Sequence, residues 1–395
     1  MSYSLADRFA GALLGVAIGD AIGAPVEGRA PDEIRARFDG PVQGFVEPWA
    51  PRPDGRVKGH GHVTDDTLMT VALTQAYLSK HGLLEPHDLA EHLIPLLADR
   101  PTFVPEYGRE MLLVERLFHP EKYLVLRLRI ASADPREAGV GNAVNCGAAM
   151  YFAPVGLMHA GDPVAAYADA VALAGAHQNS YGREAAAIIA ACIAEAVRPH
   201  GTWRTVIETA LGLAKDGTRA AIAAVATTAE RLQDLPHDSL EVARALRSAI
   251  EPFDTVKGRV SEHLNYSHYP SRTHAIEEVP AALGYLVQTQ GDVRRAIIGA
   301  ANYGRDADST AGMVGGIAAA LGGASALPPD WIACVERENR LPLTALAADL
   351  CGLWQRVYAS ERERADLRAQ ELGSQLSSPI GNGLHDSAST GEVPA

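Results

Sequence analysis

Apolar residues recur every three to four positions along most of this 395-residue chain, the spacing that places them on one face of an α-helix. Sustained alternation of period two, typical of a half-buried β-strand, is hard to find. The pattern therefore predicts an all-α fold. The predicted helices are Leu5–Ile22, Thr64–Ser79, Pro86–Ala98, Pro105–Phe118, Pro163–Leu173, Arg183–Val197, Trp203–Leu213, Ala220–Leu232, Leu240–Ile250, Val279–Gln288, Val293–Tyr303, Asp308–Leu321 and Leu341–Ala359.

The helices are expected to form one domain over residues 1–365. Two longer connections, near 101–138 and 233–274, interrupt it and have the length of substrate loops or lids. The second of them ends in an aromatic and His-rich run at Glu262–Tyr269. The remaining residues, 366–395, are increasingly rich in Ser, Gly and Pro, and we expect a disordered tail there.

Gly11, Gly15 and Gly19 recur at four-residue spacing in the first predicted helix. They line one helix face and would let another backbone approach closely. No strand precedes them and the spacing differs from that of a dinucleotide-binding loop, so packing is the better interpretation.

The net charge of −13 and the scattered Lys and Arg residues exclude an extended basic surface for nucleic acid. The first ten residues lack a signal-peptide pattern, and apolar stretches such as Ala185–Val197 are too short to span a bilayer, so neither nucleic acid nor membrane is an expected partner. The four cysteines show no CxxC spacing, which is typical of reduced thiols in a cytoplasmic protein. Cys146 could be a nucleophile, but no neighbouring residue argues for that role.

Two acidic clusters carry the clearest chemistry: residues 64–67, which read Thr-Asp-Asp-Thr, and residues 306–310, which read Asp-Ala-Asp-Ser-Thr. Each precedes an apolar helical run, and either one alone could simply cap that helix. Together they offer only carboxylate and hydroxyl oxygens, which suit Mg²⁺, Mn²⁺ or Ca²⁺ better than Zn²⁺. Because carboxylates at close range repel one another, the two clusters predict a binuclear metal site if they meet in space.

Three further segments gain meaning only from their neighbours. Glu27 follows Pro25, which ends the first helix, so its carboxylate lies on a turn. The Gly-rich residues 139–156 would expose backbone N–H groups able to cradle a phosphate. His177 lies between two Ala-rich helices. Taken singly, these are typical of an exposed loop Glu, a common Gly-rich loop and a structural histidine.

The order of these motifs along the chain resembles the ADP-ribosylglycohydrolase family, from about Ala10 to Gly322. The motifs are Gly-Asp-x-x-Gly-x-x-x-Glu ending at Glu27, the Thr-Asp-Asp-Thr cluster, the Gly-Ala-Ala-Met loop, the helix-flanked histidine and Gly-x-Asp-x-Asp-Ser. The resemblance implies a compact orthogonal multi-helix bundle with a central cleft for two divalent cations, Mg²⁺ or Mn²⁺. The metal ligands that it implies are Thr64, Asp65, Asp66, Asp306, Asp308 and Ser309.

The resemblance also implies roles in catalysis and substrate binding. Glu27 or Asp66 would act as the general acid or base, and the glycine-rich loop with His177 would contact the ribose and pyrophosphate. Tyr151 stands where many members have arginine, and Asn179 and Tyr181 near His177 also give this site its own polar character. The candidate substrate-binding residues are Asn145, Gly147, Ala148, Met150, Tyr151, His177 and Tyr181.

The expected function is a metal-dependent glycoside hydrolase that cleaves the ribosyl C1 bond of an ADP-ribosylated protein or small molecule and releases ADP-ribose. A small-molecule ribosyl N-glycosidase acting on a nucleoside or nucleotide conjugate is the alternative that the missing arginine raises. A non-catalytic ADP-ribose-binding or structural member is a third alternative, and it would be expected to lose metal ligands, which this chain retains. The oligomeric state stays open.

Overall fold

The computed structural model describes residues 3–49, 55–253 and 272–376, and among these the all-α prediction is confirmed. The chain divides into two units, Met1–Trp354 and Gln355–Ala395, and the first contains the acidic motifs. The elements of its first part are α1 (Leu5–Gly23), η1 (Ala24–Val26), α2 (Pro31–Phe38), α3 (Asp65–Lys80), η2 (Leu89–Leu93), α4 (Ile94–Ala98), β1 (Pro101–Val104), η3 (Pro105–Tyr107), β2 (Arg109–Leu112), α5 (Leu113–Arg116), α6 (His119–Val125) and η4 (Leu126–Ile130).

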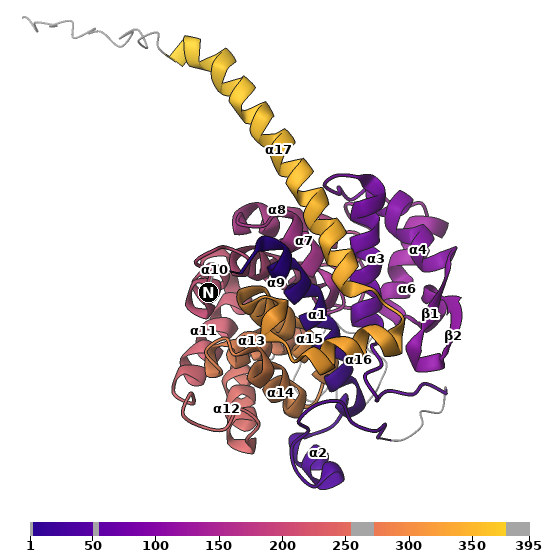
Figure 1. The fold of residues 1–395 in the computed structure, drawn as a ribbon, viewed down its shortest axis with the longest axis vertical. Helices are drawn as coiled ribbons and strands as arrows, with labels where there is room; N and C mark the ends of the chain where they lie inside the picture. Colours follow the sequence, from indigo (N-terminus) through magenta and orange to yellow (C-terminus); the bar gives the residue numbers. More distant parts are fainter. Residues whose placement is uncertain (1–2, 50–54, 254–271, 377–395) are drawn as a thin grey trace, which may run out of the picture. The chain divides into compact units, whose positions relative to one another are not determined.

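The remaining helices lie between residues 149 and 376 (Figure 1). They are η5 (Ala149–Tyr151), α7 (Ala153–Met158), α8 (Pro163–Ala174), α9 (Tyr181–Ala196), α10 (Trp203–Leu213), α11 (Asp216–Glu230), α12 (Leu240–Ile250), η6 (Glu251–Phe253), α13 (Arg272–Gln288), α14 (Val293–Tyr303), α15 (Ala307–Gly322), η8 (Ala324–Ala326), α16 (Pro329–Asn339) and α17 (Leu343–Leu376).

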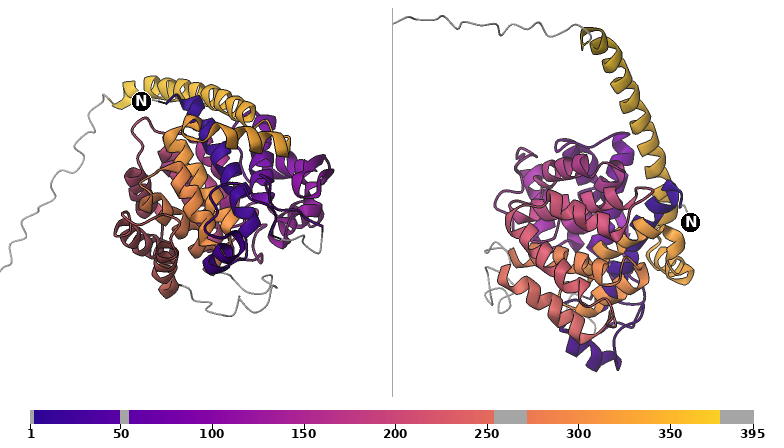
Figure 2. Two further views of the ribbon diagram at one scale, coloured as in Figure 1. Left: turned by 60° about the horizontal axis from the view of Figure 1, so that its bottom comes forward. Right: turned by 90° about the vertical axis from the view of Figure 1, so that its left-hand side faces the viewer.

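Helices α1 and α15 form the centre of the first unit, and they touch backbone to backbone (Figures 1 and 2). A Cβ added at Gly15 would lie 2.2 Å from the carbonyl oxygen of Gly315, and one added at Gly19 would lie 2.1 Å from that of Ala311. Gly11 and Gly23 make the equivalent approach one turn earlier and one turn later. The predicted packing role of the glycine repeat is therefore confirmed.

The residues Leu5–Val26 are long and apolar enough to cross a membrane by composition alone. In this fold, however, their most apolar window is completely buried in protein. The other helices supply that cover: α14, α13 and α9 pack on α15, while α3 and α7 pack on α1. The apolar character of α1 is thus that of a core helix surrounded by other helices.

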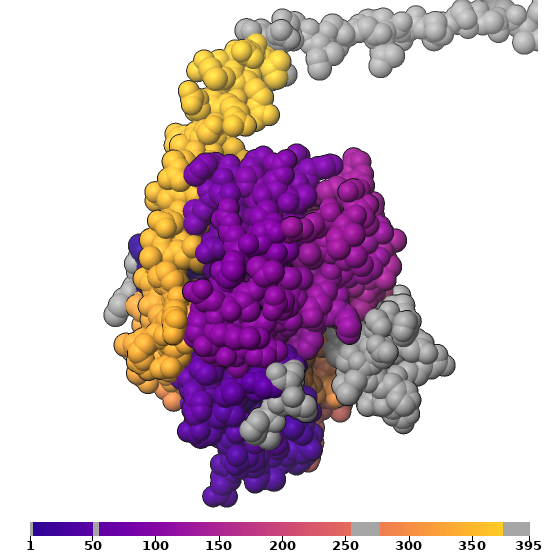
Figure 3. Space-filling view, turned by 90° about the vertical axis from the view of Figure 1, so that its right-hand side faces the viewer, coloured from indigo at the N-terminus to yellow at the C-terminus, as the bar shows by residue number. Residues whose placement is uncertain are grey.

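The predicted helix Pro105–Phe118 is wrong. Residues 101–112 form an antiparallel hairpin instead, with Pro101 opposite Leu112 and Val104 opposite Arg109. Gly108 closes its turn with a φ of 62°, a left-handed conformation that ends a helix, and only Leu113–Arg116 is α-helical. Figure 3, which faces this side of the molecule, shows the segment within a continuous purple surface.

The tail differs from the expectation at its beginning. Helix α17 continues to Leu376, so residues 366–376 are helical rather than disordered. The run 361–372 is rich in Glu, Arg, Ala, Leu and Gln, which are good helix formers, and the Ser- and Gly-rich composition begins only after it. Residues 377–395 and the aromatic run Glu262–Tyr269 lie outside the described residues.

The contact between α1 and α15 predicts opposite effects for one substitution at two helical glycines. Gly15→Ala should lower the free energy of unfolding by about 1–3 kcal/mol, because its Cβ overlaps a backbone carbonyl. Gly212→Ala in α10, where a Cβ meets nothing within 4 Å, should raise it by about 0.5–1 kcal/mol. Urea unfolding measures both, and a Gly15→Ala protein as stable as the native one would contradict the close approach.

Candidate metal centre

Asp20 fixes the start of helix α3. It lies fully buried on α1, and its carboxylate accepts hydrogen bonds from the backbone N–H of Thr64 at 2.9 Å and of Thr67 at 3.1 Å, and from the Thr67 hydroxyl at 2.5 Å. The first turn of a helix has unpaired N–H groups and a positive dipole end, both of which favour a carboxylate. Asp20 therefore holds the Thr-Asp-Asp-Thr motif against α1.

The second acidic motif meets the first beside Asp20. Asp20, Asp66 and Asp308, here called the first triad, each offer a carboxylate oxygen within 4.8 Å of the others. All three are buried, and Asp66 Oδ1 has no hydrogen-bond partner among the described residues. Oxygens around one Mg²⁺ lie within about 4.2 Å of one another, since each is about 2.1 Å from the metal. The donor atoms, their spacing and the orphaned oxygen fit a divalent cation.

A second group of carboxylates shares Asp308. Glu27, Asp306 and Asp308, here called the second triad, also offer oxygens within 4.8 Å of one another. Two backbone hydrogen bonds connect the turn after Glu27 to the loop before Asp306. Gly28 N–H donates to Arg305 O at 2.6 Å, and Arg305 N–H donates to Arg29 O at 2.8 Å. This pairing explains why residues so far apart in sequence share one site.

Lys58 contacts the second triad. Its Nζ lies 2.5 Å from Glu27 Oε2 and 3.0 Å from Asp308 Oδ2, and only 4% of its side chain is exposed. Burial alone would lower the pKa of Lys58, but Asp308 and Glu27 more than offset burial and raise it. The side chain therefore stays an ammonium ion within the cluster.

Burial and mutual repulsion dominate the electrostatics of the carboxylates. Burial raises the pKa of Asp66 and of Asp306 well above the usual range, and Asp308 adds to both shifts. Burial and Asp308 raise the pKa of Asp20 to about 7. Only the pKa of Asp308 is lowered, because Lys58 and hydrogen bonds outweigh its burial. Without a cation the cluster thus retains protons on several of its carboxyl groups, and a divalent cation would displace them by offsetting the repulsion between the carboxylates.

Asp65 points to a different partner. Its Oδ1 lies 2.9 Å from Nη1 of the fully buried Arg116, which also pairs with Glu106. Burial raises the pKa of Asp65 to about 6 even though Arg116 opposes the shift. Glu106 O in turn accepts a hydrogen bond from Val57 N–H at 2.9 Å. The segment 101–138 thus packs against the residues around Lys58 and supplies Arg116, the counter-charge of Asp65.

The structure brings the predicted metal ligands Asp66, Asp306 and Asp308 into the two triads. The hydroxyl of Thr64, which caps α3, lies 3.2 Å from Asp66 Oδ2. The backbone N–H of Ser309, which is also buried, donates to Asp308 Oδ1 at 3.2 Å. Thr64 and Ser309 therefore lie beside the triads.

The glycine-rich loop reaches the acidic cluster through Cys146. Its Sγ lies 3.1 Å from Asp306 Oδ2, and burial followed by Asp306 raises its pKa well above the usual value, which opposes a nucleophilic thiolate. The Asn145 side chain accepts from Gly147 N–H at 3.0 Å and from Gln178 at 2.7 Å, which fixes the loop. Ala148 and Met150 are buried behind it.

His177 is buried behind the same loop, with 1% of its surface exposed. Its Nδ1 lies 3.1 Å from the Tyr151 hydroxyl, and its Nε2 lies 3.5 Å from Glu121 Oε1. A Cβ at Gly147 would lie 2.5 Å from that same Glu121 oxygen. His177 and Tyr151 therefore shape the loop from below, whereas Tyr181, at the start of α9, is partly exposed.

The sequence analysis assigned no role to several residues of this site. Asp20 could have been found, because it is the single charged residue in the apolar stretch from Phe9 to Val26. Lys58 and Arg116 belong to no pattern, and only the fold brings them to the carboxylates. Glu278 joins Cys146 and Asp306 in a third group whose donor atoms lie within 4.8 Å of one another.

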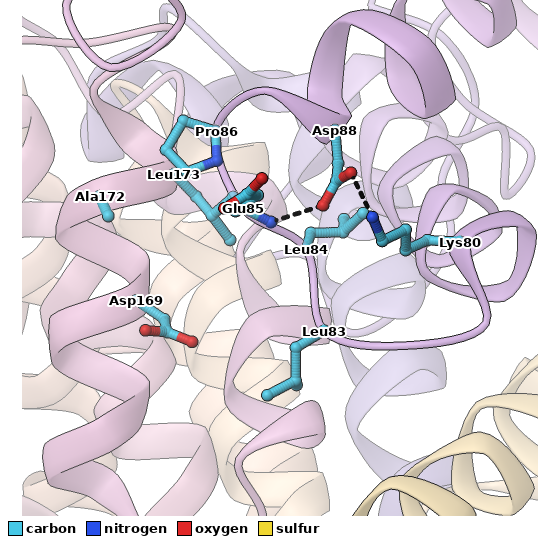
Figure 4. A pocket seen from close by; sticks show the side chains of 9 residues that line it. All are labelled: Lys80, Leu83, Leu84, Glu85, Pro86, Asp88, Asp169, Ala172 and Leu173. Atoms are coloured by element: carbon cyan, nitrogen blue, oxygen red, sulfur yellow. Dashed lines mark hydrogen bonds and ion pairs between the residues drawn. The ribbon is translucent and has the colours of Figure 1, made fainter.

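A separate hollow of about 370 Å³ lies between the end of α3 and α8, away from these triads (Figure 4). Lys80 pairs with Asp88 at 2.6 Å in its wall, and Asp88 accepts from Glu85 N–H at 2.9 Å. Lys80 and Asp88 in its wall are thus already paired with each other. The triads, with an orphaned buried oxygen, are the better candidate for chemistry.

Comparison with known proteins bears on the fold as a whole. The ADP-ribosylglycohydrolase family model matches residues 1–360. The chain is 25% identical to the uncharacterized protein YegU of Escherichia coli (strain K12), covering 90% of this chain and 98% of that protein. It is 27% identical to an ADP-ribosyl-dinitrogen reductase glycohydrolase of Rhodospirillum rubrum, covering 89% and 98%. A solved ADP-ribosylglycohydrolase-related protein complex matches with a TM-score of 0.60 and 20% identity, covering 89% of this chain and 99% of that one.

The raised pKa values predict how the metal-free protein responds to pH. With the pKa of Asp20 near 7 and that of Asp65 near 6, against 3.8 ordinarily, the folded state binds more protons than the unfolded state between about pH 4 and 7. Its free energy of unfolding should therefore fall as pH rises through this window.

A divalent cation binds the deprotonated carboxylates, so its stabilising effect should grow over the same window. Melting curves with EDTA and with Mn²⁺ at about pH 5.5 and 7.5 measure this difference, with Asp20→Asn as the variant that reduces it. A Mn²⁺-induced rise in Tm that is larger at the lower pH would contradict the assignment of the triads as the cation site.

Proposed function

Because the chain belongs to the ADP-ribosylglycohydrolase family, we propose that it is a metal-dependent glycoside hydrolase acting on an ADP-ribosylated protein or small molecule. The bond cleaved is that between the ribosyl C1 and its leaving group, and ADP-ribose is the product. The observation that carries this proposal is the pair of buried carboxylate triads that share Asp308. Family membership alone supports glycohydrolase activity, and the triads give that activity a location.

The residues that would hold the cations are the members of the two triads. Mg²⁺ or Mn²⁺ bound there would supply positive charge that orients ribose hydroxyls and lowers the pKa of a water molecule. Asp20 would keep Asp66 in place by fixing the start of α3. Arg116 would keep Asp65 charged and stationary.

Glu27 is the carboxylate best placed to move a proton. Its side chain is 25% exposed, whereas those of Lys58 and Asp308 are 4% and 5% exposed, so substrate can reach it from solvent. Cleavage at C1 develops oxocarbenium character, and a carboxylate that takes a proton from water or gives one to the leaving group lowers the barrier. Asp66, which is buried, is the second candidate for this role.

The alternative substrate class is a nucleoside or nucleotide conjugate. The observation that favours it is Tyr151. Its side chain carries no positive charge for a pyrophosphate, and its buried hydroxyl is hydrogen-bonded to His177. Removal of the phosphates from a substrate distinguishes the two classes. An ADP-ribosyl hydrolase loses turnover without them, and a nucleoside hydrolase does not.

The experiment that tests the proposal is a hydrolysis panel of ADP-ribosyl-arginine, ADP-ribosyl-serine, O-acetyl-ADP-ribose and nucleosides, each with Mg²⁺, Mn²⁺ or chelator. Release of ADP-ribose that requires metal supports the proposal and names the leaving group. Turnover of nucleosides only would replace it with the alternative. No turnover of any compound, with metal bound, would favour a non-catalytic binding protein.

Asp308→Asn should abolish hydrolysis, because Asp308 belongs to both triads. We expect loss of at least about 100-fold in kcat/KM, while the metal-free fold is retained because Lys58 still pairs with Glu27. Steady-state kinetics and circular dichroism check the two parts. Asp169→Asn, at the separate hollow, is the matched control, and full activity of Asp308→Asn would refute the shared metal site.

Glu27→Gln should lower kcat by about 100-fold or more with little change in binding of the cation at the first triad. Glu27 is not a member of that triad, so its loss should affect proton transfer and leave the ligands of the first cation in place. Single-turnover kinetics and Mn²⁺ binding separate these effects. A variant that loses the tightly bound Mn²⁺ of the first triad instead would make Glu27 a ligand of that cation as well.

A further inference from the structure

The two triads differ in the positive charge that the protein itself places beside their carboxylates. In the second triad the Lys58 ammonium lies 2.5 Å from Glu27 and 3.0 Å from Asp308, so a cation belonging to the chain itself is bonded to two of its three carboxylates. In the first triad, Asp66 Oδ1 is buried with no hydrogen-bond partner among the described residues. The first triad, although it shares Asp308 with Lys58, therefore presents an open ligand atom, and the second presents an ion pair at two of its three carboxylates.

Lys58 is held in place by its chain neighbours. Val57 N–H donates to Glu106 O at 2.9 Å, and the Arg56 guanidinium lies over the Phe118 ring, 5.1 Å from its centre. Gly59 packs so closely that a Cβ there would lie 2.7 Å from the Pro48 nitrogen. These contacts anchor the backbone on both sides of Lys58, so the ammonium can leave the triad only by rotation of its own side chain.

A metal ion and this ammonium compete for the carboxylates of Glu27 and Asp308. A divalent cation would have to lie about 2.1 Å from them, within the space that the ammonium and its hydrogen bonds take up. The two positive charges would also repel strongly at that separation in a buried site. Binding at the second triad therefore requires Lys58 to withdraw first, which costs two charge-assisted hydrogen bonds.

We propose that Lys58 and a divalent cation are mutually exclusive at the second triad, so that this protein binds one cation tightly at the first triad and a second only weakly. The inference rests on the proposed metal-dependent function and deepens it. The ammonium gives the site part of the positive charge that a second metal would bring. The weak second cation would be taken up only where its concentration is high enough to displace Lys58.

The test is Mn²⁺ binding to the full-length protein, followed by equilibrium dialysis and by electron paramagnetic resonance. Lys58→Met keeps the length of the side chain and removes its charge. Lys80→Met, which removes a lysine paired with Asp88 at the surface, is the matched control. Circular dichroism and thermal melting establish that each variant is folded.

We expect one tight Mn²⁺ in the native protein and in Lys80→Met, with the second at least about tenfold weaker. Lys58→Met should bind two with similar affinity, and its spectrum should show the broadening of two coupled ions. Two equally tight ions in the native protein, or an unchanged stoichiometry in folded Lys58→Met, would overturn the role of Lys58 alone. No Mn²⁺ bound by either protein would overturn the metal-dependent function together with this inference.

Discussion

The close approach of α1 and α15 is the constraint on which the rest of the site depends. Gly15 and Gly19 allow the two backbones to touch, and no side chain separates them. Asp20 follows Gly19 directly on α1, and Asp308 stands in the first turn of α15, so the contact delivers both carboxylates to one place. Wider separation would move them beyond the reach of a shared cation, because metal–oxygen distances leave little tolerance.

The site also depends on where its helices begin. Asp66 is in the first turn of α3, and Asp306 and Asp308 are at the start of α15, so the positive ends of two helix dipoles face the carboxylates. This arrangement offsets part of the repulsion, yet the raised pKa values of Asp66 and Asp306 show that burial still dominates. A fold that concentrates acids in this way has unfavourable electrostatics that a bound cation would relieve, as in other centres where ion binding and stability are coupled.

Much of this could be predicted from local sequence. The glycine spacing on α1 and the two acidic motifs at helix starts were visible because period and capping are local properties. The orientation of Asp65 toward Arg116 and the position of Lys58 were not, because each is decided by a partner remote in sequence. The predicted helix Pro105–Phe118 included residues 105–112 of the hairpin because their apolar residues are compatible with both periods, and the left-handed turn at Gly108 decides between them.

The segment 101–138 has a consequence for how this protein can change over evolution. It first looks like a removable addition, but it contributes Arg116 and Glu106 beneath Asp65, and Glu121 beside His177. A variant that replaced it with a shorter loop would delete a buried guanidinium and leave Asp65 without its counter-ion. The segment is therefore not modular, because it can be exchanged only together with Asp65, whose charge it neutralises.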